Sequence, residues 1–387
     1  MLRLRRQLPV YSPIRFGSLL AGASGALGLG RPRERLRARL SDHYGGPEVV
    51  LTDSGTTALR LAIRGALDAG ESDAVALPAY CCYDVVTAAI GAGARVRLYD
   101  IDPATLGPDW ASLQETLDTG VAAVVAVHLY GIPVDMGRVA ELTAAGGALV
   151  IDDAAQGFGG SIGGRPLGAL GSLGVLSFGR GKGITGGGGG ALLANDDAGR
   201  RVMASVRDLP ARGRRGWGEL ARLAAQWLLG RPSVYGLPAA LPWLGLGETR
   251  YSEPWPPRGI ARGAAAALLS NWQASLEEAE VRRRNAEALS EALADRFELP
   301  SSPVAPSTAG ALRQPILAHP GSAILPPRPK GRAAGIERGY PYLPALPALD
   351  TCLPDGCIYA HAARLAAYLR TVPTHSLSDP RATINAA

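Results

Sequence analysis

Short apolar segments alternate with helix-periodic segments through the first half of this 387-residue chain, and this alternation most limits the folds open to it. The segment 58–69 has apolar residues at positions 59, 62, 63, 66 and 67, which share one face of a helix. The apolar segments have the length and composition of buried strands and lie at 49–52, 74–78, 96–102, 121–127 and 147–151. Such alternation is typical of βαβ units, so the sequence predicts an α/β fold with a mostly parallel central sheet flanked by helices.

A lysine within a glycine-rich segment is the first candidate for chemistry. The chain contains thirty-eight arginines but two lysines, and one of these is Lys182, in the segment Ser-Phe-Gly-Arg-Gly-Lys-Gly-Ile-Thr at 177–185. Five glycines follow at 186–190 and would let the backbone pass close to a ligand. A lysine kept where the chain otherwise uses arginine indicates an amine that must lose its proton and form an imine with a carbonyl.

A carboxylate at the end of a strand is the candidate partner for that amine. Asp152 and Asp153 follow the strand predicted at 147–151, and open α/β sheets bind ligands at the carboxyl ends of their strands. Pyridoxal phosphate needs such a pair, because a lysine holds its aldehyde carbon while a carboxylate keeps the ring nitrogen protonated. Considered singly, a helix-capping aspartate and a solvated loop lysine are the commoner uses of these residues.

Three motifs together resemble the DegT/DnrJ/EryC1/StrS family of sugar aminotransferases. They are Val-Ile-Asp-Asp-Ala-Ala-Gln at 150–156 followed by Ser-Phe at 177–178 and Lys182, Gly-Thr-Thr-Ala-Leu at 55–59, and His-Leu-Tyr-Gly at 128–131. The resemblance implies a fold type I pyridoxal-phosphate-dependent transferase with a smaller α+β domain at the C-terminus. It also implies transamination, through an internal aldimine on Lys182.

The resemblance assigns a role to each expected site residue. Lys182 and Asp153 would be the catalytic residues, and Gln156 would hold the ring hydroxyl. A Gly-Thr turn at a helix N-terminus offers free N–H groups, a hydroxyl and the positive end of the helix dipole, which suit a phosphate. The expected residues for pyridoxal 5'-phosphate are Gly55, Thr56, Asp153, Gln156, Ser177 and Lys182. No metal site is expected, and a structural role is favoured over a proton shuttle for His128.

The expected reaction moves an amino group from an amino acid, with glutamate as the first candidate, to a keto sugar carried on a nucleotide. A homodimer is expected, because such sites form at the subunit interface. Two alternatives stay open: an aminotransferase acting on a non-sugar carbonyl compound, and a non-catalytic regulator that binds pyridoxal phosphate and keeps the fold.

Two domains are expected. The large one would cover 1–258, with an irregular lead-in at 1–30 and a variable segment rich in proline and tryptophan at 201–258. The small C-terminal domain would cover 259–387, beginning with a long helix at 261–293 whose arginines 282–284 lie on its solvated side.

The chain departs from the family pattern in three places. Cys82 stands where many members carry an aromatic residue that stacks on the cofactor ring, and Tyr80, Tyr83 or the thiol itself could take that place. Gly188 stands where members commonly have glutamate. A Gly-x-Asn-x-Arg segment, whose asparagine reaches the neighbouring subunit's cofactor in many members, is not found.

Composition excludes several classes of function. The formal charge of +6 comes from scattered arginines, and 6% aromatic residues form no nucleic-acid-binding pattern. No run of eighteen apolar residues occurs, so a membrane span is not expected. Basic residues and tryptophans at 212–257 could contact a membrane surface, but a subunit interface or substrate lid is preferred. The four cysteines lack zinc or disulfide spacing, which predicts a cytoplasmic protein.

Overall fold

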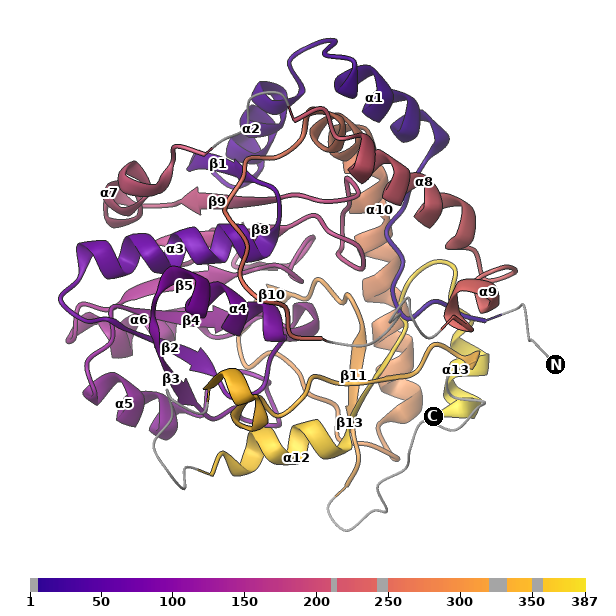
Figure 1. The fold of residues 1–387 in the computed structure, drawn as a ribbon. Coiled ribbons are helices and arrows are strands. Elements are labelled where there is room, and N and C mark those ends of the chain that lie inside the picture. Colours follow the sequence, from indigo (N-terminus) through magenta and orange to yellow (C-terminus); the bar gives the residue numbers. More distant parts are fainter. Residues whose placement is uncertain (1–5, 210–213, 242–249, 320–332, 350–357) are drawn as a thin grey trace.

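The computed structural model describes residues 6–209, 214–241, 250–319, 333–349 and 358–387 (Figure 1). A seven-stranded sheet runs through its centre in the order β1-β9-β8-β5-β4-β2-β3. Its strands are β1 (Glu48–Thr52), β2 (Ala74–Pro78), β3 (Arg95–Tyr99), β4 (Ala123–Val127), β5 (Leu149–Asp153), β8 (Leu173–Ser177) and β9 (Gly190–Ala194). β9 is antiparallel to both of its neighbours, and all other neighbours pair in parallel. The predicted α/β fold with a mostly parallel sheet is confirmed.

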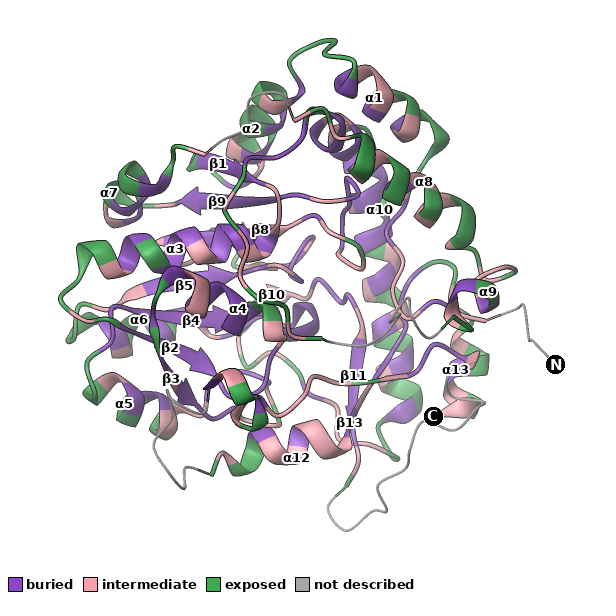
Figure 2. Cartoon of the chain, in the orientation of Figure 1, coloured by how far each residue is buried: buried purple, intermediate pink, exposed green. Residues whose placement is uncertain are grey.

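Helices cover both faces of this sheet (Figure 1). Those that alternate with the strands are α3 (Gly55–Ala69), α4 (Tyr83–Ala92), α5 (Trp110–Asp118), α6 (Met136–Ala144) and α7 (Asp197–Val206). Successive strand residues point to opposite faces, so Val50 and Leu192 join the core under α3, whereas Leu51 and Leu193 join the core under α2 (Pro32–His43). The central strands are buried along their length, and exposed residues gather on the outer helices (Figure 2).

One long helix, α10 (Arg262–Leu293), connects this sheet to the C-terminal part of the chain. Its first half packs on the large sheet through Leu268 and Trp272, and its second half packs through Leu289 and Leu293 on a small antiparallel sheet. That sheet has the order β11-β13-β12. Its strands are β11 (Gln314–Leu317), β12 (Glu337–Arg338) and β13 (Leu369–Val372), next to α12 (Ala360–Tyr368) and α13 (Pro380–Ala386). The expected α+β architecture of the C-terminal part is thus present.

Smaller elements complete the described chain. A second short sheet, of order β10-β6-β7, joins β10 (Ser307–Thr308), β6 (Ser161–Ile162) and β7 (Arg165–Pro166). The variable segment forms α8 (Trp217–Leu229) and α9 (Gly236–Ala239), while 3-10 turns occur at Leu129–Gly131, Leu343–Ala345 and Pro347–Leu349.

The prediction of an irregular lead-in at 1–30 is wrong for its second half, which contains α1 (Phe16–Ala26). Glycine in this helix serves close packing on α10. A Cβ added to Gly25 would lie 2.7 Å from the Cβ of Ala266 and 2.8 Å from the carbonyl oxygen of Arg262. Glycine therefore lets two helix backbones approach where a larger residue would separate them.

The prediction that arginines 282–284 lie on the solvated side of the long helix is wrong for Arg282, whose exposure is 0%. Three consecutive helical residues point in three directions, so one of them can face the core. A Cβ added to Gly183 would lie 3.2 Å from Nη2 of Arg282, which places this guanidinium behind the glycine-rich loop.

Over the described residues, no helix combines the length and hydropathy that crossing a membrane requires. In the same part of the chain, no three potential metal-ligating side chains gather in one place. Cys81 and Cys82 are free thiols. Cys352 and Cys357 lie outside the described residues, as do positions 212–213 and 242–249 of the segment considered for membrane contact.

Candidate active site

The six expected site residues all lie at the carboxyl edge of the large sheet. Gly55 and Thr56 begin α3 directly after β1, Asp153 ends β5 with Gln156 in the turn beyond it, and Ser177 ends β8 before the loop that carries Lys182. β9 returns antiparallel next to β8, so the five glycines are drawn back to the same edge. This is the edge where open α/β sheets bind ligands.

The first turn of α3 forms a cradle with Ser177. A Cβ added to Gly55 would lie 2.6 Å from the Cβ and 2.8 Å from Oγ of Ser177, so only glycine lets the two meet. Ser54 caps the helix by accepting a hydrogen bond from the N–H of Thr57 at 3.0 Å. The N–H of Thr56 stays at the open helix end without an acceptor among the described residues, whereas the preceding residue pair at 54–55 is tied to the glycine-rich loop by a parallel bridge between Ser54 and Gly189. The N–H of Thr56, the hydroxyl of Ser177 and the helix dipole together suit an anion.

Asp153 presents a carboxylate oxygen that is not used internally. The side chain is 4% exposed, and its Oδ1 accepts the N–H of Ala155 at 3.0 Å. No described residue donates to Oδ2. Burial raises the pKa of Asp153 above its ordinary value, and the hydrogen bond from Ala155 and the charge of Lys182 oppose this shift. A buried carboxylate of this kind gains by facing a cation.

Three side chains hold the backbone of the lysine loop from behind. Ser12 donates to the carbonyl oxygen of Lys182 at 2.5 Å, and Asn271 of α10 donates to the carbonyl oxygen of Thr185 at 3.1 Å. Arg282 lies 3.5 Å from the carbonyl oxygen of Gly183. The backbone around Lys182 is thus fixed on its inner side.

The amine of Lys182 has two neighbours that its charge affects. It lowers the pKa of Asp153 against the effect of burial, and it acts in the same direction on Cys82. The pKa of the Cys82 thiol is nevertheless raised to about 12, mainly by burial. Cys82 is therefore a neutral, compact group beside the lysine at physiological pH, in the place where many family members carry an aromatic ring.

Asp152 and His128 form a buried pair that needs no ligand. Nδ1 of His128 accepts the N–H of Val134 at 3.0 Å, so Nε2 carries the proton and donates to Oδ1 of Asp152 at 2.8 Å. The other oxygen of Asp152 accepts the N–H groups of Gly168 and Leu170, at 2.8 and 2.9 Å. Both ring nitrogens of His128 are thus occupied, which supports the structural role favoured for it.

Gln156 is held by the turn that follows β4. Its Oε1 accepts the N–H of Tyr130 at 3.1 Å, which leaves its amide N–H groups available. Tyr130 is buried in a left-handed conformation with φ 57°, which costs a non-glycine residue energy. The histidine-tyrosine turn therefore fixes the side chain of Gln156 in the turn that follows β5.

A tyrosine cluster links this edge to the C-terminal part of the chain, and sequence reasoning missed it. The hydroxyls of Tyr80 and Tyr130 are 2.9 Å apart, and Tyr80 accepts the N–H of Tyr340 at 2.9 Å. The rings of Tyr130 and Tyr340 stack with centroids 5.4 Å apart. Tyr340 lies 210 residues beyond Tyr130 in a proline-rich segment without periodicity, so no local pattern could have placed it here.

The helix α8 lies over the five glycines. A Cβ added to Gly187 would lie 2.3 Å from the carbonyl oxygen of Glu219, and one added to Gly188 would lie 3.3 Å from Cγ of Glu219. Glu219 forms an ion pair with Arg214 at 2.7 Å, and Arg214 lies 3.8 Å from Asp53, which directly precedes the cap of α3. The carboxylate of Glu219 thus occupies the space beside Gly188, where family members commonly carry glutamate in the loop itself.

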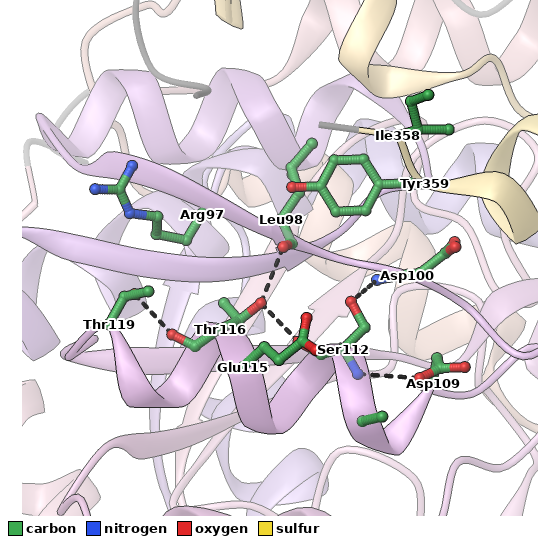
Figure 3. Close-up of a pocket in the computed structure, with 11 residues that line it drawn as sticks. Arg97, Leu98, Asp100, Asp109, Ser112, Glu115, Thr116, Thr119, Ile358 and Tyr359 are labelled. Atoms are coloured by element: carbon green, nitrogen blue, oxygen red, sulfur yellow. Dashed lines mark hydrogen bonds between the residues drawn. The ribbon is translucent and has the colours of Figure 1, made fainter. Parts of the chain in front are cut away.

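A surface cavity of about 520 Å³ lies elsewhere, between β3, α5 and the start of α12 (Figure 3). Several of its polar groups bond to one another: the hydroxyl of Ser112 accepts the N–H of Asp100, the N–H of Ser112 donates to Asp109, and Thr116 donates to the carbonyl oxygen of Leu98. None of the six expected site residues lines it. We therefore assign no chemistry to this cavity.

The residues at the sheet edge fit pyridoxal phosphate. The cradle that a Cβ at position 55 would fill can receive the phosphate, the free Oδ2 of Asp153 can face a protonated ring nitrogen, and Lys182 supplies the amine. The fold and this edge define an open α/β protein of the pyridoxal-phosphate transferase type.

The family model described as the DegT/DnrJ/EryC1/StrS aminotransferase family matches residues 21–224. A 2-deoxy-scyllo-inosose aminotransferase of Streptoalloteichus tenebrarius that uses L-glutamine is 30% identical, over 86% of this chain and 72% of its own length. This chain belongs to the DegT/DnrJ/EryC1/StrS aminotransferase family.

Two further similarities mark how far the comparison reaches. A UDP-N-acetyl-3-dehydro-alpha-D-glucosamine 3-aminotransferase of Acidithiobacillus ferrooxidans is 33% identical over 49% of this chain, and the chain spans about half of that relative, 52%. The solved structure of an E. coli GDP-4-keto-6-deoxy-D-mannose-3-dehydratase with bound hydrated pyridoxal phosphate has a TM-score of 0.75 at 17% identity, covering 99% of this chain and 98% of its own. The latter likeness shows the shared fold.

Proposed function

We propose that this chain is a pyridoxal-phosphate-dependent aminotransferase that moves an amino group from an amino acid to a keto sugar. One observation carries the proposal: a buried carboxylate with a free oxygen, a lysine whose charge acts on it, and an open helix N-terminus share one sheet edge. When bound, the cofactor withdraws electrons through its protonated ring and carries the amino group between the two substrates.

Each side chain then has a defined task. Lys182 would hold the cofactor through its amine and would move a proton at the substrate carbon. Asp153 would keep the ring nitrogen protonated, and Gln156 would hold the ring hydroxyl. Gly55, Thr56 and Ser177 would bind the phosphate.

We further propose a nucleotide-linked keto sugar as the acceptor, as in the Acidithiobacillus relative, which is named for a UDP sugar. The Streptoalloteichus relative, which aligns with 86% of this chain, is named for 2-deoxy-scyllo-inosose and L-glutamine, which makes a cyclic ketone without a nucleotide the second candidate. A panel of both acceptor types, with L-glutamate and L-glutamine as donors, separates the two.

We propose that the small C-terminal domain begins at residue 259. We also propose that two copies of the chain assemble into a homodimer. The support is an apolar surface on adjacent helices, where Phe16, Leu20 and Leu228 are 59%, 58% and 60% exposed. Phe16 of α1 contacts Trp227 of α8, so the two helices form one surface. We propose that a second copy of the chain covers this apolar surface. Light scattering of the purified protein tests the assembly, and a monomer at micromolar concentration refutes it.

We propose the cytoplasm as the location of the protein, and the free thiols of Cys81 and Cys82 support this proposal.

The decisive experiment uses the chain's scarcity of lysine. Wild type, Lys182→Ala and Lys330→Ala, which changes the other lysine of the chain, are mixed with pyridoxal phosphate and their visible absorption is recorded. We expect a band in wild type and Lys330→Ala that Lys182→Ala lacks and that an amino donor bleaches. Borohydride reduction followed by peptide mass spectrometry should place the cofactor on Lys182, and label on Lys330 alone would refute the assignment.

A further inference from the structure

An irregular segment near the N-terminus joins the C-terminal part of the chain to the lysine loop. Residues 6–12, which we call the N-terminal strap, form no helix or strand, yet Leu8 and Ser12 within it are 6% and 7% exposed. A segment without regular structure stays in one conformation only where its contacts outweigh the entropy that ordering costs. The contacts of the strap therefore show what it is held by and what it holds.

The first residues of the strap are anchored on the C-terminal part. The N–H of Gln7 donates to the carbonyl oxygen of Ala333 at 2.9 Å, and the side-chain oxygen of Gln7 accepts the N–H of Asp379, the cap of α13, at 3.0 Å. Arg6 forms an ion pair with Glu337 of β12 at 3.2 Å. Three separate segments of the C-terminal part thus hold this end.

The middle of the strap lies against His375, which follows β13. Nε2 of His375 donates to the carbonyl oxygen of Leu8 at 2.9 Å, and its ring contacts that of Tyr11 with centroids 5.9 Å apart. Burial lowers the pKa of His375 to about 4, so the ring is neutral at physiological pH and keeps its proton on the nitrogen that faces Leu8. A Cβ added to Gly335 would lie 2.8 Å from the same carbonyl oxygen, so glycine lets the strap approach this closely.

The last residue of the strap contacts the backbone of the candidate catalytic lysine. The hydroxyl of Ser12 donates to the carbonyl oxygen of Lys182 at 2.5 Å. Lys182 stands between Gly181, whose φ is 75°, and Gly183. Because glycine restricts the backbone less than any other residue, the loop itself does little to fix the peptide from which the lysine side chain extends. The bond from Ser12 supplies that restraint from outside the loop.

We propose that the N-terminal strap positions Lys182, with Ser12 as the positioning residue and the contacts on the C-terminal part as the anchor that keeps Ser12 in place. A restrained backbone narrows the orientations open to the lysine amine, so less order has to be gained when the amine bonds to the cofactor. This role rests on the proposed aminotransferase function and adds to it how the lysine is aligned.

Two cofactor forms separate positioning of the lysine from general damage to the site. Pyridoxal phosphate can bond to the amine of Lys182, whereas pyridoxamine phosphate has no aldehyde and cannot. Each is titrated without donor or acceptor and followed by absorption or fluorescence. Ser12→Ala should weaken binding of pyridoxal phosphate about fivefold, the value of one hydrogen bond, and leave pyridoxamine phosphate unchanged. Ser41→Ala is the matched control, because Ser41 of α2 donates to the carbonyl oxygen of Pro47 at 3.0 Å.

A double-mutant cycle tests the anchor. Gln7→Ala removes the side-chain contact with Asp379, five residues before Ser12, and should weaken binding of pyridoxal phosphate about two- to threefold. Added to Ser12→Ala, it should have no further effect, because the strap no longer holds the loop. Gln114→Ala, which removes an exposed hydrogen bond within α5, is the control and should change nothing. If the effects of Gln7→Ala and Ser12→Ala multiply, the strap does not connect the two sites.

The outcomes separate this inference from the proposed function. If Lys182→Ala shows the same band as wild type, the aminotransferase proposal fails, and hydrogen exchange of the cofactor-free protein still tests the strap. Ser12→Ala, but not Ser41→Ala, should then speed exchange in the peptide 177–190, and equal exchange overturns the inference.

If the lysine-dependent band forms, unchanged binding of pyridoxal phosphate by Ser12→Ala overturns the inference alone, as do equal losses for the two cofactor forms. If Ser12→Ala does not fold, Gln7→Ala decides by itself. It should weaken binding of pyridoxal phosphate and not of pyridoxamine phosphate, and any other pattern refutes the role of the strap.

Discussion

Two neighbouring aspartates at the end of β5 should respond in opposite ways to the same substitution. Asp152 is fully buried and accepts hydrogen bonds from His128, Gly168 and Leu170. Asp153 is buried but accepts one bond, and burial raises its pKa. Asparagine has nearly the shape of aspartate, so Asp152→Asn and Asp153→Asn change the charge and the hydrogen-bonding pattern while preserving volume.

The structure allows the cost at position 152 to be worked out. If the asparagine oxygen accepts the N–H groups of Gly168 and Leu170, its amide faces Nε2 of His128. The histidine must then accept at Nε2 and carry its proton on Nδ1, where it meets the N–H of Val134. Two donors, Nδ1–H of His128 and the N–H of Val134, then face each other without an acceptor, and the bonds at position 152 lose the charge of the carboxylate. Asp152→Asn should therefore lower the free energy of unfolding by about 3 kcal/mol.

Asp153→Asn should leave the cofactor-free protein as stable as wild type, or more stable. Because the pKa of Asp153 is higher in the folded than in the unfolded chain, its charged form is disfavoured by folding. The folded chain holds this proton longer, so stability falls as pH rises from the ordinary aspartate pKa through the raised one. Asp153→Asn removes that loss, and its stability should vary less with pH in this window.

Urea denaturation of the cofactor-free proteins, followed by circular dichroism at several pH values, measures both effects. Titration with pyridoxal phosphate compares the two variants in cofactor binding. Asp153→Asn should bind the cofactor with a changed spectrum and should lose the bleaching by an amino donor. The folded fraction of Asp152→Asn should keep that bleaching. Equal stability losses in the two variants, or no loss in Asp152→Asn, would refute the division of roles drawn from these contacts.

Two further substitutions test the cradle and the loop. Gly55→Ala should weaken cofactor binding about tenfold or more, because the new methyl group would collide with Ser177. Gly218→Ala is the control, because a methyl group there meets nothing within 4 Å, and it should leave cofactor binding unchanged. A fluorescence titration measures both. Gly188→Glu should lower the free energy of unfolding by about 1–2 kcal/mol, because the added carboxylate would meet Glu219. Adding Glu219→Ala to that variant should recover much of the loss in thermal unfolding. If the effects of the two substitutions simply add, Glu219 does not lie beside position 188.

Much of the sheet edge could be predicted from sequence, because its residues follow strands that are visible as apolar segments. Parallel strands bring their carboxyl ends together, so Asp153, Ser177 and the turn at Gly55 had to meet once the βαβ pattern was recognised. Lys182 stood out through the contrast with the many arginines. These inferences depend on local pattern and on one topological rule.

What escaped prediction depends on long-range packing. Tyr340 comes from a segment without periodicity, and only the docking of the C-terminal part on the turn at Tyr130 brings it to Tyr80 and Tyr130. Arg282 was assigned to solvent because arginine is usually exposed, yet it packs behind Gly183. The helix α1 was missed because Gly25 lowers helix propensity, although its small size serves the contact with α10.

The long helix α10 also sets how the C-terminal part can move. At 1.5 Å per residue its 32 residues extend about 48 Å, and a continuous helix resists bending. Asn271, in its first half, holds the carbonyl oxygen of Thr185, while Leu293 at its end belongs to the core of the small sheet. Any displacement of the small sheet would therefore have to occur at the far part of a rod that is clamped to the lysine loop. Such a displacement would shift Tyr340 relative to Tyr80 and Tyr130 while Lys182 stays in place.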